Sequence, residues 1–476
     1  MTITTDLELE ALTGQVHAAL ANWNNLSSSE EELLSGLLLV RQRRQAADNA
    51  TSPLQKRRLT NEVLQEAIDR LAAQSQRDAD VLRWRFAEEQ IIRQVATRLH
   101  ASPDQINRWQ RAAIHHLAEI LYSRETSLRD ARRRQLEDAL PPPSYTLLVG
   151  IAAARQKLLR LLSEASAPWQ VAVWGLGGIG KTALADAVCR DLCGAFIYEG
   201  IVWFRAAGQT LSGKPLNDRE VYEALLNHMA DTLWPEAAGG QTPAQRAARA
   251  ARLLRERPYL LVVDNLETTE NTSYLLEQTS DLVKPSKIVL TTRARPTIVD
   301  QAYFLPLHSL SQADAVTLMR HQARTGGLTE LANARESVLV SVYDAVGGNP
   351  LALKLVVSLA AVMPLDQILE GLAGKRTGAI DNLYRHVFWH SWRALSPEAQ
   401  TLLQAMPLIG QAGALPEQMQ AISQLPDDSF WNALTELVSR SLLEVHGSVE
   451  TRRYGIHRLT EAFLHSEIID WPPDNS

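Results

Sequence analysis

A glycine-rich segment near the middle of the chain has the residue types and the spacing that bind phosphate groups. Gly175-Leu-Gly-Gly-Ile-Gly-Lys-Thr182 fits the pattern G-x4-G-K-[ST]. Glycines let successive backbone N–H groups turn toward an anion, a lysine there reaches the β- and γ-phosphates, and the threonine hydroxyl ligates Mg²⁺. The residues that we therefore expect to bind a nucleotide are Gly175, Gly177, Gly178, Ile179, Gly180, Lys181, Thr182 and Ala183.

A carboxylate at the end of an apolar run is the expected partner of this loop. Tyr259-Leu-Leu-Val-Val-Asp264 is typical of a buried strand, and a carboxylate at such a strand end holds the magnesium of P-loop NTPases. Thr182 and Asp264 are therefore the predicted Mg²⁺ residues. Asn265 follows in place of a second acid, which favours slow hydrolysis and a switch over a motor. Glu267, two residues further along, is a weaker candidate for the general base that would act on the attacking water.

The elements that must position these residues are visible in the hydrophobic pattern. The apolar run 170–174 predicts a strand before the glycine-rich segment, and residues 181–193 predict a helix after it. Further runs of strand length at 201–204, 259–263 and 287–290 alternate with helical segments, which predicts a parallel sheet covered by helices. Residues 311–373 have helical periodicity, and two short strands, 441–445 and 453–456, suggest a small β wing.

Composition and charge narrow the class of protein. The chain has 476 residues, is 45% hydrophobic, and carries a net charge of −6 with only two cysteines, so disorder and a disulfide scaffold are excluded. Residues 41–134 hold 19 Lys and Arg against 12 Asp and Glu, so a basic N-terminal module lies within an acidic chain. The chain begins without a signal-peptide pattern and has no apolar stretch long enough to span a membrane, so we expect a cytoplasmic protein without membrane contact.

Three consecutive prolines in Ala139-Leu-Pro-Pro-Pro-Ser-Tyr145 predict a linker, because no helix interior tolerates them. We expect a multidomain fold: an N-terminal all-α bundle, a central α/β P-loop NTPase with a parallel sheet, a helical lid and a C-terminal winged helix. The expected boundaries are 1–138 for the helical N-terminal domain, 139–146 for the linker, 147–310 for the nucleotide-binding domain, 311–378 for the lid and 379–476 for the winged helix.

Four motifs together resemble one family, the NB-ARC (STAND) nucleotide-binding switch proteins. They are Gly175–Thr182, Leu260–Asp264, Lys287-Ile-Val-Leu-Thr-Thr-Arg293 and Gly347-Gly-Asn-Pro-Leu-Ala-Leu353. They occur in the family's order, and the resemblance covers about residues 145–465. It implies ATP or ADP as ligand with Mg²⁺ as cofactor, and Lys181, Asp264 and Arg293 as the catalytic set of a slow ATPase.

The resemblance also implies roles for single residues. Arg293 would sense the γ-phosphate, to which the fixed fork of a guanidinium is suited. Pro350 would pack against the adenine and hinge the lid, and Val149 and Gly150 would touch the adenine through backbone, although Ile151 replaces the family's usual arginine. His457, in Ile456-His457-Arg458, would contact the β-phosphate of ADP, with Arg458 in the place of the family's aspartate.

The mechanism implied by the resemblance is a shift between two domain arrangements. With ADP the winged helix folds back onto the nucleotide domain, and with ATP the open form is favoured. Open subunits of this family associate, so we expect a homo-oligomer in the active state. One phosphate contact rarely shifts such a balance alone, so a trigger or partner, such as a separate sensor or effector protein, is expected to contribute.

The basic N-terminal module carries a second pattern, at about 77–121. Two short helix candidates, 81–86 and 91–99, precede a longer amphipathic helix that is expected to end at about Leu121 and begins with a capping box of Ser102 and Gln105. This layout is that of a helix-turn-helix, and it resembles region 4 of sigma factors, with His100 in place of the usual turn glycine. The candidate DNA-binding residues are Gln105, Asn107, Arg108 and Arg111.

Two other interpretations compete with a DNA-binding regulator of transcription or defence. The N-terminal helices could recruit a protein effector without touching DNA, because helix-turn-helix patterns are short and ordinary three-helix bundles share them. An ordinary P-loop ATPase is a weaker third hypothesis.

Overall fold

The computed structural model describes most of the chain and divides it into two compact units. The described residues are 7–24, 34–47, 52–166, 168–206, 216–237, 239–266, 269–280, 283–293, 302–361, 363–373, 388–389, 391–393, 395–409, 413–440, 442–446, 452–456, 458–464 and 468. The first unit comprises Met1–Glu137 and Gly194–Phe196, and the second comprises Asp138–Cys193 and Ile197–Ser476. Among the described residues, no helix is both long enough and apolar enough to cross a membrane.

The N-terminal unit is helical, as predicted. Its elements are α1 (Leu9–Ala21), α2 (Leu38–Ala46), α3 (Pro53–Gln74), α4 (Gln76–Leu82), a π-helical turn η1 (Arg83–Ala87), α5 (Ile92–Arg98) and α6 (Pro103–Asp138). Leu59, Val63, Leu64, Ala67, Ile68 and Leu71 of α3 are buried, as their 3–4 spacing predicts. A separate small cluster of Val81, Val95, Ala96 and Ile106 joins α4, α5 and the start of α6.

The turn between α5 and α6 is held by its own residues. Ser102 Oγ accepts from the backbone N–H of Gln105 at 3.2 Å, and Gln105 Oε1 accepts from the backbone N–H of Ser102 at 3.0 Å, so the predicted capping box is present. His100 has a φ of 50°, the left-handed conformation for which a glycine is the usual residue. The turn therefore forms here with histidine in that position.

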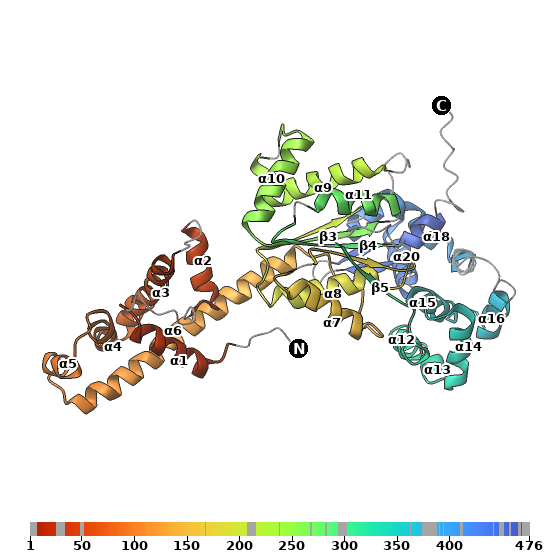
Figure 1. Ribbon diagram of the computed structural model, residues 1–476. Coiled ribbons are helices and arrows are strands. Elements are labelled where there is room, and N and C mark those ends of the chain that lie inside the picture. Colours follow the sequence, from red (N-terminus) through yellow and green to blue (C-terminus); the bar gives the residue numbers. More distant parts are fainter. Residues whose placement is uncertain are drawn as a thin grey trace. The chain divides into compact units, whose positions relative to one another are not determined.

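The expected end of α6 near Leu121 is wrong, because the helix runs on to Asp138 (Figure 1). No proline or glycine interrupts the sequence before Pro141. Leu136 and Glu125 of the extension are buried, and the carboxylate of Glu125 accepts from the backbone N–H groups of Leu38 and Leu39 at 2.9 and 3.1 Å. Packing against the start of α2 thus extends the amphipathic helix beyond its most apolar part.

A parallel five-stranded sheet forms the centre of the second unit. Its strands are β1 (Gln170–Trp174), β2 (Gly200–Arg205), β3 (Tyr259–Leu266), β4 (Lys287–Thr292) and β5 (Ala302–Pro306), in the order β2-β3-β4-β1-β5. All neighbouring strands pair in parallel. The predicted sheet is confirmed, but β5 was not among the predicted strands. It is a short edge strand beside β1.

Helices cover both faces of the sheet (Figure 1). On one face lie α9 (Asp218–Leu233), α10 (Pro243–Glu256) and α11 (Thr269–Thr279), whose apolar residues share a core with β2, β3 and β4. On the other lie α7 (Ala152–Ser163) and α8 (Lys181–Cys193), which pack against each other. A parallel sheet buried on both faces explains the nearly continuous apolar runs of β1, β3 and β4.

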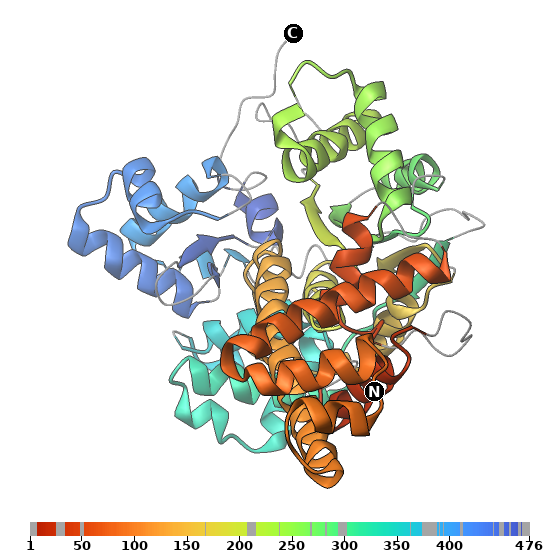
Figure 2. The ribbon, with the colours of Figure 1, turned by 90° about the vertical axis from the view of Figure 1, so that its left-hand side faces the viewer.

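The C-terminal part is mainly helical (Figure 2). Its buried apolar residues share one hydrophobic core. The helices are α12 (Gln312–Thr325), α13 (Thr329–Ala332), α14 (Glu336–Val346), α15 (Pro350–Leu359), α16 (Leu365–Ala373), α18 (Pro397–Ala405), α19 (Pro416–Ser423), α20 (Asp427–Ser439) and α21 (Arg458–Phe463). An antiparallel hairpin is formed by β6 (Glu444–His446) and β7 (Arg453–Gly455), close to the two predicted wing strands. The boundaries assigned to lid and winged helix stay predictions.

The strand order decides what lies beside the glycine-rich loop. Because β4 lies between β1 and β3, its carboxyl end is next to the loop, and the backbone N–H of Gly175 donates to Thr292 O at 3.3 Å. The end of β3 lies one strand further, in register with the end of β2, where Arg205 pairs with Asp264. The carboxyl ends of four strands therefore meet at one edge, which is where open α/β sheets bind ligands.

Candidate nucleotide-binding site

The glycine-rich loop joins β1 to α8 as a tight turn whose interior follows the backbone. Gly178 has a φ of 72°, and a Cβ built on it would lie 2.7 Å from Leu351 Cβ, so this position combines a left-handed conformation with a close approach. Helix α8 begins at Lys181 and presents its N-terminal N–H groups to the loop. The partial positive charge of that end favours an anion such as phosphate.

Lys181 lies over the loop that precedes it. Its Nζ donates to the carbonyl oxygens of Gly175 and Leu176, both at 2.8 Å. The pKa of Lys181 is lowered to about 8, mainly by burial and also by the nearby positive charge of Arg293, with Asp264 acting in the opposite direction. The ammonium group is thus held by neutral carbonyls in a site that would gain from an anionic ligand.

Asp264 connects the loop to the middle of the sheet. It is 1% exposed, and its Oδ1 accepts from Thr182 Oγ1 at 2.7 Å and from Thr291 Oγ1 at 2.6 Å. Thr291 also accepts from the backbone N–H of Asn265 at 2.8 Å. The carboxylate is therefore fixed against the hydroxyl at the start of α8, and both groups are the hard oxygen donors that Mg²⁺ prefers.

The loop forms one side of a partly open cavity of about 180 Å³. Lys181, Arg205 and Arg293 all line it, and each comes from the carboxyl side of a different strand. Among the described lining residues no carboxylate is present, and Asn265 lines the cavity directly after Asp264. This end of the cavity is therefore suited to hold an anion, and it lacks, within the described residues, a group that could take a proton from water.

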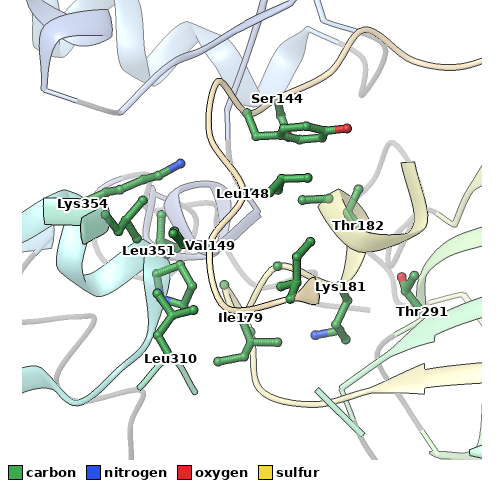
Figure 3. Close-up of a pocket in the computed structure, with 18 of the residues that line it drawn as sticks. Ser144, Leu148, Val149, Ile179, Lys181, Thr182, Thr291, Leu310, Leu351 and Lys354 are labelled. Carbon is green, nitrogen blue, oxygen red and sulfur yellow. The ribbon is translucent and has the colours of Figure 1, made fainter. Parts of the chain in front are cut away.

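The opposite wall of the cavity is mainly apolar, with Lys354 of α15 beside Leu351. Figure 3 shows Val149, Leu310 and Leu351 on one side, with Lys181, Thr182 and Thr291 on the other. Ser144 and Leu148 stand on the segment that precedes α7 and passes over the cavity. A slot with mainly apolar walls at one end, and Lys181, Arg205 and Arg293 at the other, matches a nucleotide, whose base is flat and whose phosphates are charged.

Helix α15 contributes Pro350, Leu351 and Lys354 to the same cavity, and Asn349, the residue before the helix, bonds to the glycine-rich loop. Asn349 Nδ2 donates to Gly177 O at 2.9 Å, and Asn349 Oδ1 caps α15 by accepting from the N–H groups of Leu351 and Ala352 at 3.0 and 3.4 Å. The neighbouring carbonyl of Gly348 accepts from the N–H of Leu310 at 2.8 Å, and a Cβ on Gly348 would lie 2.2 Å from Leu310 O. Asn349 thus fastens the start of α15 to the glycine-rich loop, which we call the phosphate loop, and Gly348 fastens it to Leu310.

Most of the residues predicted from the sequence meet at this cavity. The lining residues among them are Val149, Gly177, Gly178, Ile179, Gly180, Lys181, Thr182, Ala183, Arg293 and Pro350. Gly175 and Asp264 stand directly behind, bonded to Lys181 and Thr182. Gly150 follows Val149 in the chain, where a Cβ would meet Leu310. His457 lies outside the described residues, as does Glu267.

Several residues in or beside the cavity were given no role from the sequence, including Asn349, which lies within the recognised motif 347–353 and next to the cavity. Asn349 could have been found, since an asparagine directly before a proline that starts a helix is a strong N-cap pattern. Thr291 lies within a recognised motif, but its bond to Asp264 depends on the strand order. Arg205 and Lys354 line the cavity from β2 and α15, and no local pattern marks either of them.

The four candidate DNA-binding residues lie in the first three turns of α6. Gln105, Arg108 and Arg111 are exposed, and Asn107 is half-buried. The amide oxygen of Gln105 is engaged in the cap, and Arg111 Nε donates to Asn107 O at 3.4 Å. The two arginines are therefore exposed near the start of the helix, and their role in DNA binding stays a prediction.

Fold and site together define a P-loop NTPase. Residues 152–327 match the profile of the NB-ARC domain. The chain therefore contains an NB-ARC domain, a nucleotide-binding domain of the STAND class, as the four sequence motifs predict.

Named relatives match parts of the chain. The disease resistance protein RPV1 of Vitis rotundifolia is 27% identical over 228 residues, which covers 46% of this chain and 15% of that protein. The transcription activator GutR of Bacillus subtilis is 24% identical over 318 residues, covering 61% of this chain and 37% of that protein. The chain thus spans well under half the length of either relative. Among solved structures, a STAND protein with a tetratricopeptide repeat sensor from Pyrococcus horikoshii has a TM-score of 0.45 at 18% identity, covering 68% of this chain and 43% of that one.

Replacing Asn349 by aspartate separates the bond that its side chain donates from the bonds that it accepts. Asn349→Asp keeps an acceptor for the α15 cap but removes the donor to Gly177 O, so we expect ADP to bind about tenfold more weakly, the effect of losing one buried hydrogen bond. Isothermal titration measures the affinity. Asn217→Asp is the matched control, because Asn217 caps α9 in the same way and does not line the cavity. Equal affinities of the two variants for ADP would contradict the role of Asn349.

The lowered pKa of Lys181 predicts a pH dependence of nucleotide binding. Above about pH 8 the lysine of the empty site is mostly neutral, whereas bound phosphates favour its charged form, so binding must take up a proton. We expect the affinity for ADP to change little near pH 7, where its phosphates are largely ionised, and to fall by up to about tenfold per pH unit above pH 8. Titration at pH 9 in two buffers of different ionisation enthalpy measures the proton uptake. An affinity that stays constant from pH 7 to 9.5 would disprove this.

Proposed function

We propose that this chain is a nucleotide-operated switch, in which ADP favours a closed arrangement of the NB-ARC domain and the C-terminal helices and ATP favours an open one. The observation that carries the proposal is the shared cavity. The phosphate loop lies on the sheet, Pro350 and Leu351 lie on α15, and Asn349 bonds the two together. A ligand in this cavity touches both parts, so its identity affects how they fit.

The phosphate end of the cavity supports roles for the predicted residues. Lys181 and the N–H groups of 175–183 would bind the phosphates, and Thr182 with Asp264 would hold Mg²⁺, which neutralises charge between the β- and γ-phosphates. The bonded hydroxyl and carboxylate fit that ion, since both offer hard oxygen donors within 2.7 Å of each other. With Asn265 after Asp264, hydrolysis is proposed to be slow and to serve as a timer.

Discrimination between ATP and ADP is assigned to Arg293. It lines the cavity close enough to Lys181 to lower the pKa of that lysine, so a terminal phosphate beside Lys181 would lie within its reach. A shift from 1:99 to 99:1 requires about 5.5 kcal/mol of differential binding, more than one charged hydrogen bond provides. A separate sensor or effector protein is therefore part of the proposal, as is self-association of the open form.

Other assignments complete the closed state. Val149, Gly150 and Pro350 are proposed to enclose the adenine, and His457 to contact the β-phosphate. The domains proposed to move are the lid at 311–378 and the winged helix at 379–476, against the nucleotide domain at 147–310. The protein is proposed to act in the cytoplasm.

The proposed output is DNA binding by the α5–α6 helix-turn-helix. Exposed Arg108 and Arg111 near the start of α6 support it, as does the likeness to a bacterial transcription activator. The alternative is recruitment of a protein effector by the same helices, which the likeness to plant resistance proteins leaves open.

Arg293→Ala tests the switch. We expect the variant to bind ADP with nearly unchanged affinity and a non-hydrolysable ATP analogue at least about tenfold more weakly, because only the analogue has the phosphate that the guanidinium contacts. Titrations of both ligands with Mg²⁺ measure the ratio. Arg219→Ala, an exposed arginine of α9, is the control. If the variant lost affinity for both ligands equally, Arg293 would not distinguish them.

Small-angle scattering of the full chain with ADP and with the ATP analogue tests the conformational change itself. We expect two different scattering profiles for the unmodified chain. Identical profiles would remove the basis of the proposed switch.

Arg108→Ala combined with Arg111→Ala tests the DNA-binding output. We expect the full chain to be retained on duplex DNA in a salt-dependent way, and the double variant to bind at least about tenfold more weakly with a smaller salt slope. The control is Arg58→Ala with Arg70→Ala, which removes the same charge from exposed positions of α3. Absence of DNA retention, or equal loss in both double variants, would favour the effector-recruiting alternative.

A further inference from the structure

A buried polar network ties the segment before α7 to the helix that follows the phosphate loop. Tyr145 Oη donates to Asp186 Oδ2 at 2.7 Å. Arg190, one helical turn after Asp186, donates to both carboxylate oxygens at 2.9 Å and to the backbone oxygen of Pro141 at 2.6 Å. We call Tyr145, Asp186, Arg190 and the Pro141 carbonyl the α8 clamp.

The centre of the α8 clamp is not a surface ion pair. Asp186 is 3% exposed, and all three of its side-chain bonds go to the clamp residues just named. Burial and the hydrogen bond to Asp186 raise the pKa of Tyr145, so its hydroxyl stays protonated and donates. The bidentate arginine and the phenol bond the buried carboxylate of Asp186 in fixed directions, so the arrangement is geometrically specific. Loss of a partner is costly, because the carboxylate would be left with fewer bonds in a site that water solvates poorly.

The far side of this segment is held to α8 as well. Helix α7 begins at Ala152, and its Arg155 donates to both carboxylate oxygens of Asp191 at 2.8 and 2.6 Å. Residues 144–151 are thus fastened to α8 at both ends. Between the two attachments lie Leu147, Leu148, Val149 and Ile151, which line the cavity opposite the phosphate loop.

Different turns of α8 therefore contribute to different parts of one cavity. Its first residues, Lys181 and Thr182, belong to the phosphate side, and its second and third turns carry the carboxylate and the arginine that position the other wall. The sequence shows no sign of this, since Tyr145 and Asp186 are 41 residues apart and neither belongs to a recognised motif.

We propose that Asp186 and Arg190 are positioning residues for nucleotide binding: through Tyr145 and Pro141 they hold segment 144–149 against the base side of the cavity. The clamp then determines affinity for the nucleoside part of the ligand and contributes nothing to the grip on the phosphates. The inference rests on the proposed nucleotide site and adds a specific mechanical link to it. Because α6 ends at Asp138, the clamped segment is also the covalent continuation of the N-terminal unit.

The test compares ADP with pyrophosphate, which contains the phosphates without the nucleoside. Tyr145→Phe and Asp186→Asn are made in the full chain, and affinities are measured by titration with ADP and by displacement of a fluorescent ADP analogue with pyrophosphate. We expect both variants to bind ADP about tenfold more weakly, the size expected for one lost hydrogen bond to a charged group, with unchanged affinity for pyrophosphate. Tyr222→Phe, a half-buried tyrosine of α9 that does not line the cavity, is the matched control.

A second readout follows the segment itself. Amide hydrogen exchange at 144–149 is expected to slow on ADP binding in the unmodified chain, and to remain faster in Tyr145→Phe at saturating ADP. Tyr145→Phe preserves the ring, so it retains the fold if Asp186→Asn fails to. Equal loss of ADP and pyrophosphate affinity, or unchanged ADP affinity in Tyr145→Phe, would overturn the inference. If instead the unmodified chain bound neither ADP nor pyrophosphate, the proposed nucleotide site itself would fail.

Discussion

A polyanion can leave water only if the protein replaces its hydration with positive charge and N–H donors, and this requirement organises the second unit. The loop 175–180 supplies backbone, α8 supplies a helix N-terminus, and Lys181 supplies a cation whose pKa is lowered because it is itself desolvated. The ammonium group of this lysine donates to two backbone carbonyls of the loop at 2.8 Å. The remaining parts of the site are arranged around this loop.

Bonds to the loop and to α8 link three regions that are distant in the sequence. Asp264 fixes the threonine at the start of α8, Asn349 fixes the start of α15 to Gly177, and Asp186 fixes the segment before α7. Each of these side chains is buried and makes more than one bond, so its position is well defined. A ligand that alters the loop would thereby act on the sheet, the C-terminal helices and the linker together, which is the physical basis of the proposed switch.

In the N-terminal unit, the start of helix α6 follows from the local sequence, whereas its end follows from packing. The capping box of Ser102 and Gln105 sets the start of α6, and both of its bonds are present. The end of that helix was predicted too early, because burial of Glu125 and Leu136 extends it beyond its most apolar stretch. His100 adopts the left-handed turn conformation usual for glycine, so this turn did not require the expected residue.

The phosphate loop, the helix after it and the strand that ends in Asp264 could be predicted from the sequence, because glycine spacing and apolar runs are local properties. The NB-ARC class was indicated by the resemblance of four motifs to that family. The sequence did not reveal β5, the bond between Asn349 and Gly177, or the α8 clamp, whose partners are 41 residues apart. These three features depend on the tertiary structure, because strand order and helix packing bring together residues that no local pattern connects. The placement of Arg293 near Lys181 depends on both sequence and tertiary structure. The motif marked the arginine, and the position of β4 next to β1 brings it to the loop.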